Sequence, residues 1–510
     1  MRTSAPNVGR RRLAGAAVAA LALLIAADVS SQPPTHQLLV VIDGLRPDYV
    51  TPALMPRLHA LGARGVVFEA NHSVFPTVTR VNASSIATGA YPETHGLLGN
   101  VVYSPKTFPA KGVNTSNYAE LEAMARAEGR LLDAPTLGDS LARAGKRFLV
   151  FSAGSTGSAF LLGQPHSQGA VVNPDYVIPS ELAARVTEAL GPGPAEAVPN
   201  HARNKWVVDA YLSFGLTAPA DDVAAIWLGD PDATAHQQGI GSDLTTTALR
   251  QVDAEIGRIE DTLRARGLLD RTNIIVTSDH GFSTHTGELR LAALVAPFTK
   301  ALEDGSADIV VTEGAVNFRG ATDPARVVAV VGALQKRPEV GAIFTRPVRP
   351  GSSQGQVPGT LSFEVARWGH SRSAEILVSG NWTATINAAG YAGTTTLGGV
   401  AGHGTSSVYD IHNALIVAGP DFRERTRSAV PTSNVDIAPT ILKVLRLAQP
   451  TSMSGRPIDE ALKGGPTPHS VRIDRLVQSA RTADGSYQLD AHISVVDGRR
   501  YLDYTEVRRP

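Results

Sequence analysis

Six acidic and imidazole side chains stand close to predicted strands, and their chemistry suits a metal ion. Apolar runs at residues 37–42, 224–228 and 273–277 are each followed by acidic residues, and the run at 414–418 is preceded by a histidine. An aspartate after a strand is more often a turn residue or helix cap, and a lone histidine more often lies on the surface, so the inference rests on the combination. The residues are Asp43, Asp232, His236, Asp279, His280 and His403.

The chain has no cysteine, so any metal must be held by histidines and carboxylates, and disulfides are excluded. Three aspartates and three histidines match the oxygen and nitrogen ligands that zinc accepts. Six ligands suffice for two ions with three ligands each, which leaves an open position for substrate.

A hydroxyl side chain that could act as a nucleophile lies in a second segment. Thr79 precedes a helix-like stretch that ends near Thr88 and Gly89. A hydroxyl at a helix start lies beside unpaired backbone N–H groups, which suit a phosphate oxygen. A threonine hydroxyl is a poor nucleophile unless a base or a metal lowers its pKa. The alternative is that Thr79 only caps the helix.

Buried strands and amphipathic helices must position these groups. Continuous apolar runs at residues 37–42, 147–151, 224–228, 273–277 and 414–418 are typical of buried parallel strands. The clearest helix has Leu249, Val252, Ile256, Ile259 and Leu263 on one face. The alternation of strands and helices predicts an α/β fold with a mainly parallel sheet flanked by helices. The carboxyl ends of such strands are where ligands collect.

The pattern divides the chain into five predicted parts. After an export signal at 1–31, the catalytic α/β core spans 36–281 and resumes at 400–465. An α+β cap is inserted at 282–399, with a helix near 323–335, and the Gly/Thr-rich run at 390–399 is expected to be a loop. A β-hairpin extension at 466–510 is predicted from Asp497-Gly498.

The N-terminus has the pattern of an export signal. Three arginines at 10–12 precede an apolar stretch at 13–27, which is short for a membrane span. The arginines also resemble a twin-arginine signal, and an uncleaved anchor is the alternative. No other segment approaches membrane-spanning length, so we expect a periplasmic or secreted protein with no membrane span in the mature chain.

Composition excludes two classes of protein. The 47 basic and 47 acidic residues balance, which argues against a nucleic-acid-binding surface. Hydrophobic residues make up 43% of the chain, enough for a buried core, so global disorder is not expected.

Five motifs occur in an order that resembles a known family. Together they resemble the nucleotide pyrophosphatase/phosphodiesterase branch of the alkaline phosphatase superfamily, over residues 38–281 and 402–447. The motifs are Asp43-Gly44, the run from Phe75 to Thr79, the run from Thr88 to Gly96, Pro231-Asp232 with His236, and the run from Ser278 to Gly281.

The resemblance implies an alkaline-phosphatase-like fold with two Zn²⁺ ions per chain and a small-molecule phosphodiester or pyrophosphate substrate. It implies that one zinc activates the nucleophile Thr79, that the other lies beside the leaving group, and that Asn100 donates to a phosphoryl oxygen. It further implies a phosphothreonine intermediate. The implied ligands of the first zinc are Asp43, Thr79, Asp279 and His280, and those of the second are Asp232, His236 and His403.

Two departures from the family pattern affect the substrate. Residues 152–158 are small and uncharged, and Arg80 stands where many relatives carry an apolar side chain. Arg80 is predicted either to steer an anionic substrate or to be solvated. The alternatives to a phosphodiesterase are a threonine-nucleophile alkaline phosphomonoesterase and a catalytically dead binding protein. A sulfatase is not expected, because sulfatases of this superfamily need a modified Cys or Ser and the chain has Thr79.

Overall fold

The computed structural model describes residues 1–4, 35–217 and 222–510, and His36–Pro510 forms one compact unit. The predicted export signal at 1–31 falls almost entirely outside the described residues and stays a prediction. No helix among the described residues has the length and apolar character needed to cross a bilayer.

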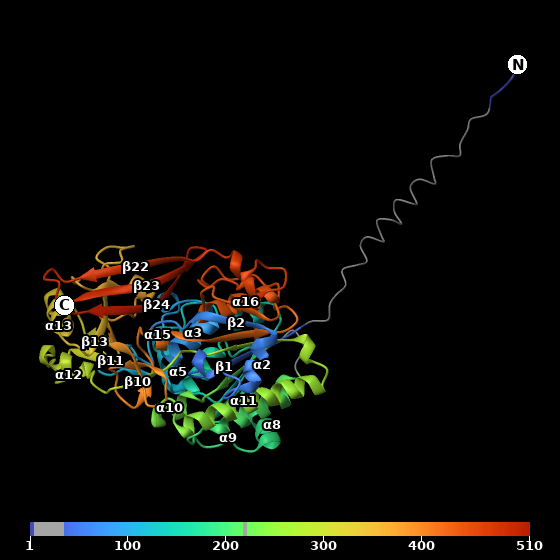
Figure 1. Cartoon of the computed structure of the whole chain (residues 1–510), viewed down its shortest axis with the longest axis horizontal. Helices are drawn as coiled ribbons and strands as arrows, with labels where there is room; N and C mark the ends of the chain where they lie inside the picture. Colours follow the sequence, from blue (N-terminus) through green and yellow to red (C-terminus); the bar gives the residue numbers. More distant parts are fainter. Residues whose placement is uncertain (5–34, 218–221) are drawn as a thin grey trace. The chain divides into compact units, whose positions relative to one another are not determined.

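A central sheet runs through this unit (Figure 1). Its strands are, in spatial order, β20 (Thr426–Ser428), β2 (Val66–His72), β19 (His412–Ala418), β9 (Thr272–Thr277), β1 (His36–Ile42), β8 (Val223–Leu228), β5 (Phe148–Ser152), β6 (Ala170–Asn173) and β7 (Tyr176–Ile178). A further short strand, β21 (Thr432–Ser433), pairs with β2.

Most neighbours in this sheet are parallel, including β1 with β8 and β9, and β5 with β6 and β8. The predicted mainly parallel sheet is therefore confirmed. One strand was predicted wrongly, because β19 runs antiparallel to both β9 and β2. A strand buried on both faces is apolar whichever way it runs, so the apolar run at 414–418 carries no signal of direction.

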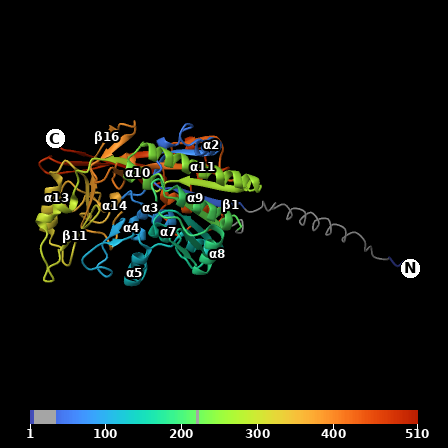
Figure 2. The same cartoon turned by 90° about the horizontal axis from the view of Figure 1, so that it is seen from below.

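Helices cover both faces of the sheet (Figure 2), and side chains of β1 alternate between two cores. Leu39 and Val41 pack in the cluster that includes α3, α5, α6, α7 and α16, while Leu38, Val40 and Ile42 pack in the cluster that includes α2, α9 and α11. The predicted amphipathic helix is α11. These helices are α2 (Pro56–Arg64), α3 (Thr79–Thr88), α5 (Tyr118–Glu128), α6 (Leu137–Arg143), α7 (Thr156–Leu162), α9 (His201–Ala210), α11 (Asp243–Ala265) and α16 (Ile437–Val444).

Several further helices and short strands pack on the main sheet and its helices. The helices are α4 (Pro92–His95), α8 (Ser180–Leu190), α10 (Asp232–Gln238) and α15 (Val408–Ile411), and the strands are β3 (Val101–Val102) and β4 (Val113–Asn114).

The range predicted to form a cap contributes two further sheets. The first has the order β11 (Ile309–Thr312), β12 (Ala315–Phe318), β15 (Ile376–Gly380), β13 (Val340–Thr345) and β14 (Leu361–Ser362), with helices α12 (Leu291–Val295), α13 (Pro324–Gln335) and α14 (Phe363–Ala366). The second has the order β16 (Trp382–Ile386), β17 (Ala392–Thr395), β10 (Ser283–His285) and β18 (Ala401–Gly402).

The expected loop at 390–399 was wrong in part, because β17 lies inside it and pairs with β10 and β16. Threonine-rich sequence favours strands, and this preference outweighs the surrounding glycines. The predicted helix near 323–335 is α13. The five-part division of the chain stays a prediction.

The predicted C-terminal hairpin is present and gains a third strand. Strands β23 (Gln488–Val496) and β24 (Arg499–Arg508) pair across Asp497-Gly498, and β22 (Asp474–Arg481) pairs with β23. The Tyr501 hydroxyl donates to Asp436 Oδ2 over 3.0 Å, which ties this sheet to the residue before α16.

Candidate metal centre

Asp43 lies where β1 ends, and neighbouring elements fix its side chain. The indole N–H of Trp227, on β8, donates to Asp43 Oδ2 over 2.9 Å. The following residue, Gly44, has a φ of +71°, and a Cβ there would lie 3.2 Å from the Cβ of Asp232. The left-handed turn at glycine therefore brings the end of β1 close to the start of α10.

Asp43, Asp279 and His280 form a first group of potential ligands, all buried. Their ligand atoms lie within 4.8 Å of one another. His280 Nε2 is 3.1 Å from Asp279 Oδ2 and 3.5 Å from Asp43 Oδ1. Asp279 and His280 follow β9, so the two adjacent parallel strands β1 and β9 place all three residues at one sheet edge.

Asp232, His236 and His403 form a second group, which is more open to solvent. Asp232 and His236 are four residues apart on α10 and therefore share one face of the helix. Asp232 Oδ1 lies 3.2 Å from His236 Nε2 and 3.4 Å from His403 Nε2. His403 follows β18, so the second sheet of the 282–399 region and its flank complete this group.

A backbone carbonyl orients each of the three histidine rings. The Nδ1–H groups of His280, His236 and His403 donate to the carbonyl oxygens of Gly281, Ala401 and Thr77 over 2.9, 2.9 and 2.7 Å. A carbonyl can only accept, so in the neutral ring it is Nε2 that carries the lone pair, on the side of the carboxylates. This arrangement is common around metal ions, where it fixes the tautomer of a ligating histidine.

Three carboxylate oxygens in the groups are buried without a hydrogen-bond partner among the described residues: Asp43 Oδ1, Asp232 Oδ1 and Asp279 Oδ2. Burial raises the pKa of Asp43 well above its ordinary value, and the Asp279 and Asp232 carboxylates raise it further. Buried carboxylates with unpaired oxygens cost free energy unless a cation balances them. The donor set therefore fits a divalent cation in each group.

The two groups lie side by side. The rings of His280 and His403 stack with centroids 3.4 Å apart and an interplanar angle of 13°. Burial, together with the nearby His280, lowers the pKa of His403 to about 4. His403 is therefore neutral at neutral pH, as a metal ligand must be.

Thr79 is the first residue of α3, and its side chain is buried. Its Oγ lies 3.3 Å from His280 Nε2, within reach of the first group. The residue preceding the helix is Val78, and no side chain caps this helix end. The alternative that Thr79 only caps the helix is therefore wrong.

Asn100 faces the same site from the loop after α4. Its Oδ1 accepts from the backbone N–H of Arg80 over 3.0 Å, and its own backbone N–H donates to Glu313 Oε2 over 2.9 Å. The first contact turns the amide oxygen toward the start of α3. The Asn100 amide nitrogen has no hydrogen-bond acceptor among the residues that the structure describes.

Arg80 is half-buried rather than fully solvated. Its Nε is buried and has no hydrogen-bond partner among the residues that the structure describes. Burial lowers the pKa of Arg80, while the carboxylates of Glu313, Asp43 and Asp232 raise it. The guanidinium therefore lies in the field of the aspartates of both groups.

Two residues that hold the site, Trp227 and Glu313, were not predicted from the sequence. Trp227 belongs to the apolar run of β8, and that pattern predicts burial of the indole but no hydrogen bond from its N–H. Glu313-Gly314 lies between two short alternating strands, a hairpin-turn signal, and Glu313 has a φ of +50°. That signal predicts the turn but not its contact with Asn100.

Comparison with known proteins agrees with this site. Residues 37–405 match the family described as type I phosphodiesterase / nucleotide pyrophosphatase. Human ectonucleotide pyrophosphatase/phosphodiesterase family member 7 is 28% identical over 273 residues, 52% of this chain and 53% of that protein. The bis(5'-adenosyl)-triphosphatase enpp4 of Xenopus laevis is 25% identical over 282 residues, 54% of each chain. The chain thus spans about half the length of these curated relatives.

Solved structures show the same fold. Murine ectonucleotide pyrophosphatase / phosphodiesterase 5 superposes with a TM-score of 0.59 and 17% identity, covering 84% of this chain and 100% of that chain. An inactive form of that murine protein, in complex with AMP, gives a TM-score of 0.57 and 16% identity, covering 82% and 96%. These likenesses confirm the predicted α/β fold.

Proposed function

Because this chain belongs to the type I phosphodiesterase / nucleotide pyrophosphatase family, we propose that it is an exported, zinc-dependent hydrolase of phosphodiester or pyrophosphate bonds that acts through a phosphothreonine intermediate. One observation carries the proposal. Two groups of three potential ligands lie side by side, and a threonine hydroxyl is 3.3 Å from one of the histidines. The chemistry of the groups, with no thiolate, suits zinc.

Asp43, Asp279 and His280, with Thr79 Oγ, would hold one zinc, and Asp232, His236 and His403 would hold the other. When bound, two such cations lower the pKa of a nearby hydroxyl and balance charge on the attacking and leaving oxygens.

The residues of the chain supply the rest of the reaction. Thr79 Oγ gives its proton to solvent water and attacks phosphorus. The bond from phosphorus to the leaving oxygen breaks, that oxygen takes up a proton from solvent and departs as an alcohol, and a phosphothreonine remains. Water then attacks phosphorus, the bond to Thr79 Oγ breaks, and the hydroxyl is restored. The Asn100 amide nitrogen donates to the phosphoryl oxygens, where negative charge gathers, and so do N–H groups at the start of α3 other than that of Arg80, which donates to Asn100 Oδ1.

The small, uncharged residues 152–158 favour a diester over a monoester. A monoester dianion carries an extra charge, and this segment offers no cation to bind it. Arg80 is the one observation that supports the second candidate function, a phosphomonoesterase, because it follows Thr79 directly in the sequence and its buried Nε has no hydrogen-bond partner among the described residues. The names of the relatives make nucleotides the first diesters to test.

The test is metal analysis of the purified chain, followed by parallel assays of an aryl phosphodiester, the matching monoester and the matching sulfate ester. We expect about two zinc ions per chain and the highest kcat/KM for the diester. Active protein that contains no metal would contradict the zinc site, and preference for the sulfate ester would contradict the reaction class.

A further inference from the structure

A cavity of about 750 Å³ adjoins the two ligand groups. His236, His403 and Asn100 line one end of it. Its volume lies within the range of cavities that hold small molecules, about 300–1,000 Å³. A substrate whose phosphate lies at the two groups would therefore place one of its ester substituents in this cavity.

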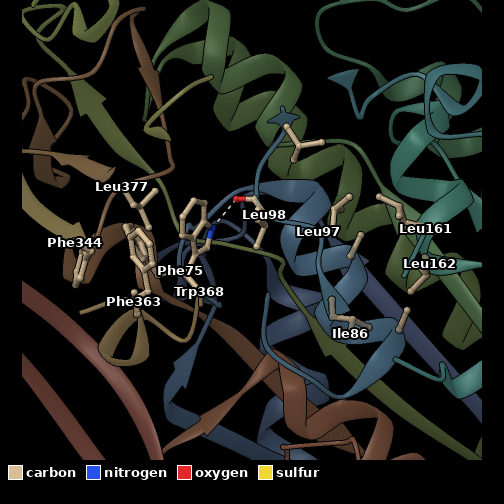
Figure 3. Close-up of a cluster of buried hydrophobic side chains, with 14 of the residues drawn as sticks. Phe75, Ile86, Leu97, Leu98, Leu161, Leu162, Phe344, Phe363, Trp368 and Leu377 are labelled. Atoms are coloured by element: carbon tan, nitrogen blue, oxygen red, sulfur yellow. Dashed lines mark hydrogen bonds between the residues drawn. The ribbon is translucent and has the colours of Figure 1, made fainter. Parts of the chain in front are cut away.

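The remainder of the wall is largely apolar. The side chains that line it come from the loop after α4, from β3, from the first sheet of the 282–399 region and from the loop after β17. They include Leu98, Val102, Val311, Leu377, Val378 and Leu397. Figure 3 shows Leu98 and Leu377 on either side of Trp368, whose indole N–H donates to the Leu98 carbonyl over 2.9 Å. The indole therefore presents only its apolar surface to a ligand.

Most polar groups in this wall already have partners within the protein. The Asn317 amide donates to the carbonyl of Val310 over 3.0 Å. The Arg372 guanidinium donates to the carbonyls of Gly96 and Leu131 over 3.2 and 2.9 Å. A nucleobase has several donors and acceptors that need partners when buried, so this wall would leave them unsatisfied.

The polar groups that retain hydrogen-bonding capacity lie at the ends of the cavity. His285 Nε2 is buried without a hydrogen-bond partner among the described residues. A Cβ on Gly402 would lie 3.1 Å from that nitrogen and 2.9 Å from His236 Cε1, so His285 is at the ligand-group end. The side chain of Arg290 is exposed, which places it where the cavity meets solvent.

We propose that this cavity binds a bulky apolar ester group of the substrate, an alkyl or aryl alcohol, rather than a nucleoside. The inference rests on the proposed function in one respect, the placement of the substrate phosphate at the two ligand groups. Burial of apolar surface supplies the affinity, and a nucleobase is rejected because the polar side chains described in the middle of the wall already have partners within the protein.

The test is calorimetric titration of the zinc-loaded full chain with methyl, butyl and octyl phosphate and with AMP. These ligands share one phosphate group and differ in what enters the cavity. From butyl to octyl phosphate, we expect Kd to fall by about 100-fold, because each buried methylene strengthens binding about threefold to fourfold. AMP should bind more weakly than octyl phosphate. A Kd independent of chain length, or tighter binding of AMP, would overturn the proposal.

Variants connect this effect to the cavity. Val311→Asn places an amide in the apolar wall, and Ala315→Leu, on the neighbouring strand, fills part of the volume; each should reduce the gain per methylene. Val477→Asn, at a site that is 54% exposed on β22, is the matched control and should keep the full gain. An undiminished gain in both cavity variants would overturn the proposal. Because binding of these monoesters needs no turnover, failure of the proposed function would appear separately, as a chain-length effect in a protein that does not hydrolyse the aryl phosphodiester.

Discussion

At the scale of single residues, Thr79 is the first residue of α3, and its Oγ lies 3.3 Å from His280 Nε2 of the first ligand group. We expect Thr79→Ala to remove most turnover while zinc content and melting temperature stay nearly unchanged, because the hydroxyl is the proposed nucleophile but only one of four ligands. Steady-state kinetics, metal analysis and thermal melting of the variant test this. Near-normal turnover would show that water attacks phosphorus directly.

The charge of Arg80 bears on which ester is preferred. We expect kcat/KM to be higher for an aryl phosphodiester than for the matching monoester, because residues 152–158 offer no cation for the second negative charge. Arg80→Ala should leave this order unchanged, and exposed Arg475→Ala on β22 is the matched control. If the monoester were preferred and Arg80→Ala alone abolished the preference, the phosphomonoesterase would be the correct function.

His95 makes stability depend on pH. Burial, together with the nearby His370 and Arg372, lowers its pKa from 6.5 to about 3. Its Nδ1 accepts from the backbone N–H of Leu97 over 3.1 Å, and its Nε2 bonds Ser85 Oγ over 3.0 Å. Below pH 6.5 the unfolded chain binds a proton at His95 that the folded chain does not bind. The contribution of neutral His95 to the free energy of unfolding is therefore complete above pH 6.5 and is lost as pH falls toward 3.

We therefore expect the free energy of unfolding to fall more steeply with acid in the wild-type chain than in His95→Gln. The difference should be about 1.4 kcal/mol per pH unit below pH 6. Denaturant unfolding at several pH values measures it, with exposed His469→Gln as the control. Equal slopes for wild type and His95→Gln would contradict the assignment.

At the scale of elements, the turn between β11 and β12 contacts the loop after α4. Glu313 Oε2 accepts from the Asn100 backbone N–H, so we regard Glu313 as a positioning residue. We expect Glu313→Ala to lower kcat about tenfold by loss of a charged hydrogen bond, with zinc content unchanged. Glu313→Gln retains an acceptor oxygen and should restore most of kcat.

Asn100→Ala sets the scale for this comparison, at about 3 kcal/mol for loss of a donor to the phosphoryl oxygens. The effect of Glu313→Ala should be smaller, because the amide itself remains. A loss in Glu313→Gln as large as in Glu313→Ala would show that the negative charge matters rather than the contact with Asn100.

Some elements were predicted from the sequence pattern and others could not be. Apolar runs and 3.6-residue periodicity predicted the strands β1, β8 and β9 and the helix α11, because burial on one or two faces leaves a local trace. The direction of β19 and the contact between Glu313 and Asn100 leave no such trace. Both depend on which distant segments meet, and 213 residues separate Glu313 from Asn100.

At the scale of the whole molecule, both ligand groups unite segments that are distant in sequence. Asp43 meets Asp279 and His280, and His403 meets the start of α10. Only the folded chain brings these ligands together, so metal binding should stabilise the fold, by about 2.7 kcal/mol for each site when free zinc is 100 times the Kd of that site. Thermal melting after chelation and during zinc titration measures this effect.

Variants that lack one ligand show how much each ligand group contributes to the stabilisation by zinc. Asp232→Ala and Asp43→Ala should each lose one of the two ions preferentially, and each should keep part of the zinc-dependent rise in melting temperature. A melting temperature indifferent to zinc, or loss of both ions in both variants, would contradict two separable sites.

The contact between Trp227 and Asp43 also gives the protein an internal optical probe. The chain has four tryptophans, and one of them donates directly to a carboxylate of the first ligand group. A cation that withdraws charge from this carboxylate changes the electric field along the indole and hence its emission. A second fluorophore, Trp368, forms part of the cavity wall. Occupancy of the ion sites and of the cavity can thus be followed in the unlabelled protein by two different indoles.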